Sequence, residues 1–174
     1  MTKFLGMCTG ALALVLLLST QAAAQAVTLT ADLTGGEETP AALNTGMFGT
    51  IAVGVDQASK ELTVTLRVFN TPTPTTAGHI HMGSPGTPGP TVLNFPAALN
   101  GRVGDFAMTF RLGDTAGVFT PRPAIGINTI DDVIEAVVGG NTYVNVLSAN
   151  FAKGEIRGQI RGRRFGDLKM DDED

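Results

Sequence analysis

The stretch "ELTVTLRVF", residues 61–69, alternates apolar and polar side chains without a break. Its apolar members fall on one face of an extended chain: Leu62, Val64, Leu66 and Val68. Successive side chains of a β-strand point to opposite faces, so this pattern is typical of a strand with one face buried and the other in water. The sequence therefore predicts antiparallel β-structure, in which half-buried strands are common.

Working outward, the same alternation or the same turn signals recur along the chain. The predicted strands are residues 27–33, 47–55, 61–69, 76–82, 91–95, 104–112, 142–148 and 154–161. Residues 56–60 form a short hairpin-like connection between two of them. About eight short strands with turn residues between them indicate an all-β sandwich or barrel.

One segment has a different period. In "NTIDDVIEAVVGGN", residues 128–141, apolar side chains recur at helical spacing. Thr129 and Asp132 have the spacing of a capping box, and Gly139 and Gly140 are typical of a helix end. One short helix is predicted near residues 129–139.

The two ends of the chain differ from the strand-rich part. Residues 1–26 combine Lys3, the apolar run "GALALVLLLS" and the small-residue segment "TQAAAQA", which is the pattern of a secretory signal peptide. Cleavage near Ala24 or Ala26 would leave a mature protein that is secreted or periplasmic. The domain then spans residues 27–161, and the charged tail 162–174 is expected to be disordered.

Composition excludes some classes of function. Cys8 is the only cysteine and lies in the signal segment, so the mature chain is expected to be free of disulfides. The net charge of −4 argues against nucleic acid as a partner, because no dominant positive field is available. No second apolar run is long enough for a membrane span, so we expect a protein that does not span the membrane, with an unknown protein or surface partner.

Both histidines of the chain lie in "AGHIHMGSPGTPGP", residues 77–90. On a strand, His79 and His81 share one face about 6.6 Å apart. Two imidazoles at that spacing can converge on one metal ion, and such ligands suit copper. The structural alternative places Ile80 in the core and the imidazoles outside, hydrogen-bonded to the following loop. Glu38 and Met82 are further candidate ligands.

The segments "HIHMGSPGTPGPTV" (79–92) and "NTYVNVLSANFAKGEIRGQI" (141–160), with the opening "LTGGEETPA" (33–41), resemble the CHRD domain of chordin and of exported bacterial proteins. The resemblance implies an immunoglobulin-like, Greek-key antiparallel β-sandwich without an assigned biochemical role. It also shows one departure, since Leu147-Ser148 stand where the family usually has His-Thr.

Catalysis lacks a complete set of residues. Ser84 and Ser148 lie in no nucleophile elbow, and no third histidine is present to act as a base. Superoxide dismutase, whose copper–zinc form has a similar His-x-His strand, needs more histidines.

The favoured function is a non-catalytic binding or structural module outside the cytoplasm. The alternative is a periplasmic copper or transition-metal-binding protein using His79 and His81. Glu155 and Arg157 of "GEIRG" share the polar face of the last predicted strand, where a cross-strand or same-face ion pair would contribute little, and the motif is interpreted as architectural.

Overall fold

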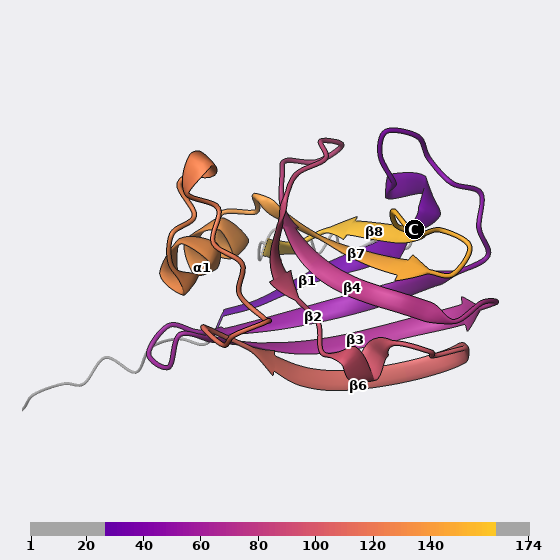
Figure 1. The fold of residues 1–174 in the computed structure, drawn as a ribbon, viewed down its shortest axis with the longest axis horizontal. Helices are drawn as coiled ribbons and strands as arrows, with labels where there is room; N and C mark the ends of the chain where they lie inside the picture. Colours follow the sequence, from indigo (N-terminus) through magenta and orange to yellow (C-terminus); the bar gives the residue numbers. More distant parts are fainter. Residues whose placement is uncertain (1–26, 163–174) are drawn as a thin grey trace, which may run out of the picture.

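The computed structural model describes residues 27–162, and the predicted signal peptide and most of the charged tail lie outside them. Antiparallel strands make up most of the regular secondary structure of the described chain (Figure 1). The strands are β1 (Val27–Thr34), β2 (Phe48–Asp56), β3 (Glu61–Thr71), β4 (Thr75–Met82), β5 (Thr91–Asn94), β6 (Gly104–Leu112), β7 (Thr142–Ser148), β8 (Ile156–Gln159) and β9 (Arg161–Gly162). Short 3-10 turns lie at Gly35–Glu37, Ala97–Leu99 and Pro123–Ile125.

All nine strands belong to one sheet, in the order β5-β4-β7-β8-β1-β2-β3-β6, with β9 paired to β1. The sheet curls until its two edges approach, and the rings of Phe95, after β5, and Phe110, on β6, lie 4.8 Å apart. The all-β prediction is confirmed, but the sandwich layout is not. Strand β1 pairs with both β2 and β8 and so joins the two halves into one nearly closed, barrel-like sheet.

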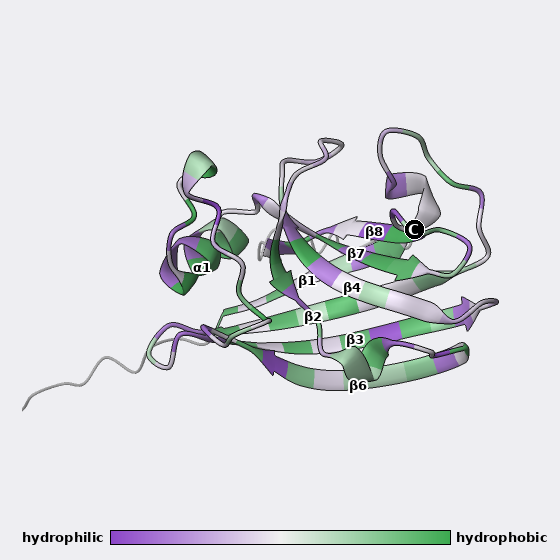
Figure 2. Cartoon of the chain, in the orientation of Figure 1, coloured by the Kyte–Doolittle hydropathy of each residue, from purple (hydrophilic) through white to green (hydrophobic). Residues whose placement is uncertain are grey.

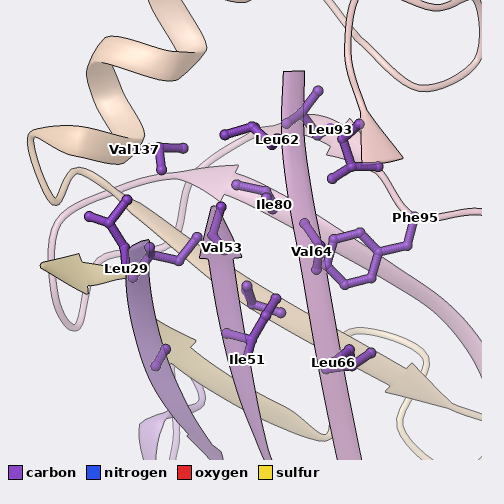
Figure 3. Packing of buried hydrophobic residues seen from close by; sticks show 14 of the residues in the cluster. Leu29, Ile51, Val53, Leu62, Val64, Leu66, Ile80, Leu93, Phe95 and Val137 are labelled. Carbon is purple, nitrogen blue, oxygen red and sulfur yellow. The ribbon is translucent and has the colours of Figure 1, made fainter. Parts of the chain in front are cut away.

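The core lies inside this curl, where the apolar side chains of the alternating strands meet (Figures 2 and 3). Leu66 on β3 has none of its surface exposed, and its backbone neighbours are Ile51 on β2 and Met108 on β6. The period-two pattern of residues 61–69 therefore assigned the buried face correctly.

The predicted last strand is interrupted. Residues 154–161 were expected to form one strand, but β8 ends at Gln159 and the short β9 follows Ile160. A side chain at Gly158 would collide with the Asp32 carbonyl oxygen, so this glycine permits close approach of β8 to β1.

The helix α1 (Ile130–Val138) begins and ends within one residue of the predicted bounds. The capping box is present, because Thr129 Oγ1 accepts from the Asp132 amide and the Asp132 carboxylate accepts from the Thr129 amide. Its buried face includes Val137, which lies over the end of the core near Leu29 and Leu62 (Figure 3). No helix within residues 27–162 is long and apolar enough to cross a bilayer.

Candidate functional site

Strand β4 places the two histidines on the outer face of the sheet. Ile80 between them is fully buried in the core, whereas both imidazoles are only partly buried. Strand β7 lies on one side of β4, with Asn145 opposite His79 and Tyr143 opposite His81. Strand β5 lies on the other side and is an edge strand, as the prolines before it predict.

The imidazoles are close and differ in their partners. Their ring centroids lie 5.5 Å apart in an edge-to-face arrangement. His81 Nδ1 lies 2.9 Å from the Gly89 carbonyl oxygen in the loop that follows β4. A carbonyl oxygen only accepts, so Nδ1 carries the proton and, in the neutral ring, Nε2 keeps its lone pair. The predicted bond between this loop and an imidazole is thus present at His81.

Burial lowers the pKa of both histidines below the usual value. For His81 the Gly89 hydrogen bond opposes this effect, while the charges of His79, Arg157 and Arg122 add to it. Both rings are therefore neutral at pH 7, which is the form in which imidazole binds metals.

Tyr143 joins His81 to a buried arginine. The His81 and Tyr143 rings are stacked, with centroids 4.9 Å apart and planes 10° from parallel. The Arg157 guanidinium carbon, from β8 on the other side of β7, lies 3.5 Å from the Tyr143 ring centroid. Such a cation–π contact stabilises the pair by about 2 kcal/mol or more when it is shielded from water.

Arg157 is only 1% exposed because two loops fold over it. Its guanidinium donates to Thr39 Oγ1 at 2.6 Å and to the carbonyl oxygens of Thr87 and Ser84 at 2.9 and 3.4 Å. These residues belong to the β1–β2 and β4–β5 connections, which rise on the same side of the sheet (Figure 1). Arg157 therefore fixes both loops.

The ion pair expected at Glu155 and Arg157, across strands or along the same face, is absent within residues 27–162. Glu155 Oε1 instead accepts from Thr45 Oγ1 at 2.6 Å, and the partners of Arg157 are the two loops. The ion pairs found within residues 27–162 are Lys60–Asp131 and Arg111–Glu61, both exposed. The loop 38–47 covers this end of the sheet. Glu155 and Arg157 therefore form hydrogen bonds with this loop, through Thr45 and Thr39, and not with each other.

The described residues hold no group of three or more histidine, cysteine or acidic side chains placed for one metal ion. The structure therefore does not bring Glu38 to His79 and His81. Glu38 instead lies near Arg157, whose charge acts on its carboxyl group. Leu147 shares the outer face of β7 with Tyr143 and Asn145, and its backbone partner on β4 is Ala77, two residues before His79.

Together, the fold and this site define an all-antiparallel β domain whose outer face carries two imidazoles backed by a buried tyrosine–arginine stack. The CHRD domain family matches residues 29–160, and the chain belongs to this family. Comparison with curated proteins and with solved structures gave no match.

Proposed function

We propose that this CHRD domain is a non-catalytic binding module that acts outside the cytoplasm through the surface around His79 and His81. The observation that carries the proposal is the hydrogen bond between His81 Nδ1 and the Gly89 carbonyl oxygen. It fixes the ring and its tautomer, so that Nε2 keeps its lone pair and accepts one long hydrogen bond, from Thr91 Oγ1 at 3.5 Å. A ring held in this way is preorganised for a ligand.

Copper is the ligand that we infer for this surface. Metal-binding histidines usually donate their second ring N–H to a carbonyl or carboxylate, as His81 does. Both imidazoles are neutral near pH 7 because burial lowers each pKa. The nearby charges of Arg157 and Arg122 work against a dication, so two imidazoles alone predict a weak site.

A third imidazole tests the location of this site. Leu147 lies on the same face of β7 as the partners of the two histidines. We expect Leu147→His to tighten copper(II) binding roughly tenfold or more, about 1.4 kcal/mol, because a third nitrogen ligand replaces water. Isothermal titration of tag-free protein measures the change. The control is Thr109→His, which adds a histidine at an exposed position on the outer face of β6. Val146→His would not serve as a control, because Val146 is buried in the core. Equal affinity in Leu147→His and wild type would show that this face does not bind copper.

Export is the second part of the proposal. It is supported by the charged, apolar and small-residue regions within residues 1–26. We expect the protein recovered from the periplasm or the medium to begin at Gln25 or Val27. Intact-mass spectrometry of that protein measures the start, and a mature form that retains Met1 would disprove the signal peptide.

A further inference from the structure

A concave site lies at Thr39, one of the residues that accept a hydrogen bond from Arg157. It is a cavity of about 340 Å³ between the β1–β2 connection and the β7–β8 connection. Its walls are mostly apolar and include Pro40, Leu43 and Phe151. Glu38 forms part of the same wall. We name this space the Glu38 cavity.

Two buried acceptor oxygens at this cavity lack a hydrogen-bond donor among the described residues. Glu38 is 7% exposed, and its Oε1 is buried without a hydrogen-bond partner among the described residues. Asn145 adjoins Glu38 and uses its Nδ2 on the Lys153 carbonyl oxygen at 3.3 Å, while its Oδ1 also has no partner there. A buried acceptor without a donor costs about 1–3 kcal/mol, so a ligand that supplies donors is favoured.

Arg157 does not meet this need. Its guanidinium donates to Thr39 Oγ1 and to the Ser84 and Thr87 carbonyl oxygens, all in the loops above it. Its charge still acts on Glu38 and lowers the pKa of the carboxyl group, but burial has the larger effect and raises that pKa to about 7. Hydrogen bonds from the Thr39 amide and the Asn145 side chain also lower this pKa, but burial outweighs all three effects, so the charged carboxylate is disfavoured at neutral pH.

We propose that the Glu38 cavity binds a small primary amine with an apolar body, whose ammonium group lies against Glu38. An ammonium group brings three N–H donors and a positive charge, which match the two unpartnered oxygens, Glu38 Oε1 and Asn145 Oδ1, and the negative charge of the Glu38 carboxylate. An alcohol brings a single donor and no charge. A carboxylate ligand brings only acceptors, so it leaves the same oxygens unpaired. The apolar walls then cover the hydrocarbon part of the amine.

Three probes with six carbon atoms each separate these cases: hexylamine, hexanol and hexanoate. Titrations followed by ¹H–¹⁵N NMR spectra of the full mature protein report both affinity and location. We expect hexylamine to bind roughly tenfold or more tightly than hexanol, because its donors are charged, and to shift the amides of residues 38–39, 41–43 and 150–154. Stronger binding of hexanoate, or equal binding of all three probes, would overturn the proposal.

The pH dependence gives a test without any substitution. Hexylamine keeps its charge through this range, since alkylammonium groups titrate near pH 10.4. Glu38 loses its proton as the pH rises through its pKa of about 7, so affinity should increase across that value. The other charged groups nearby are Arg157, and Lys153 on the cavity wall. An affinity that is flat between about pH 5 and about pH 8 would contradict the role of Glu38.

Glu38→Gln removes the charge and keeps the shape. The pKa of Glu38 is raised from 4.5 to about 7 by folding, so ionising Glu38 makes the folded state less stable as the pH rises through this interval. A neutral glutamine has no such cost, so we expect Glu38→Gln to fold. We expect hexylamine binding to weaken roughly tenfold or more in this variant, through loss of the charged partner. Glu37→Gln, at the exposed neighbouring carboxylate, is the matched control and should bind as wild type. Equal affinity in Glu38→Gln and Glu37→Gln would exclude Glu38 as the anchor.

Discussion

Arg157→Met is expected to reduce the free energy of unfolding by about 3–5 kcal/mol, because each buried acceptor that loses its donor costs about 1–3 kcal/mol. The Thr87 and Ser84 carbonyl oxygens and the Thr39 hydroxyl lose their donor when the guanidinium is removed. Tyr143 also loses its cation–π partner. Methionine fills much of the space but donates no hydrogen bond.

Urea denaturation measures this loss as a lower midpoint at an unchanged slope. Arg161→Met is the matched control, because Arg161 is an exposed arginine four residues further along. Exposed substitutions of this kind change stability by less than about 0.5 kcal/mol. A similar midpoint for the two variants would mean that Arg157 does not hold the loops.

Leu66→Ala is expected to cost about 2–5 kcal/mol, from the lost burial of the side chain and the cavity that it leaves. Leu66 is fully buried and lies in the middle strand of the β2–β3–β6 group. Since small domains are stable by only about 5–15 kcal/mol, the variant should unfold at a clearly lower temperature.

Thermal and urea unfolding measure the change in Leu66→Ala. The control is the variant Thr63→Ala, because Thr63 is exposed on the same strand. The control changes the outer face and should stay within about 0.5 kcal/mol of wild type. A neutral Leu66→Ala would show that the inner face of β3 is assigned wrongly.

The sequence predicted the strands well and their arrangement less well. Alternation in residues 61–69 identifies the buried face, because the side-chain period of a strand is two. It does not say which strands pair, so the partnership of β1 with both β2 and β8, which joins the halves into one sheet, could not be read from it. The helix was found because Thr129 and Asp132 are a local signal.

The candidate site was predicted only in part. His79 and His81 were found from their spacing, and Ile80 between them is in the core as expected. Arg157 and Tyr143 were missed as a unit, since alternation places Arg157 on the polar outer face, where solvent was the expected neighbour. Its burial comes from loops at residues 38–47 and 83–90, and contacts so distant in sequence leave no periodic signal. The burial of Glu38 Oε1 without a hydrogen-bond partner was missed for the same reason, because it depends on how the loop 38–47 folds.

Copper(II) titration of the tag-free mature protein, compared with the double variant His79→Ala, His81→Ala, tests the proposed binding surface most directly. We predict one-to-one binding that weakens roughly tenfold or more in the double variant, which has lost both nitrogen ligands. Binding should also weaken as the pH falls through the lowered histidine pKa values, because protons then compete for the same nitrogens. The double variant retains the terminal amine and every carboxylate. Equal affinity in the two proteins would place the ion elsewhere and contradict the account.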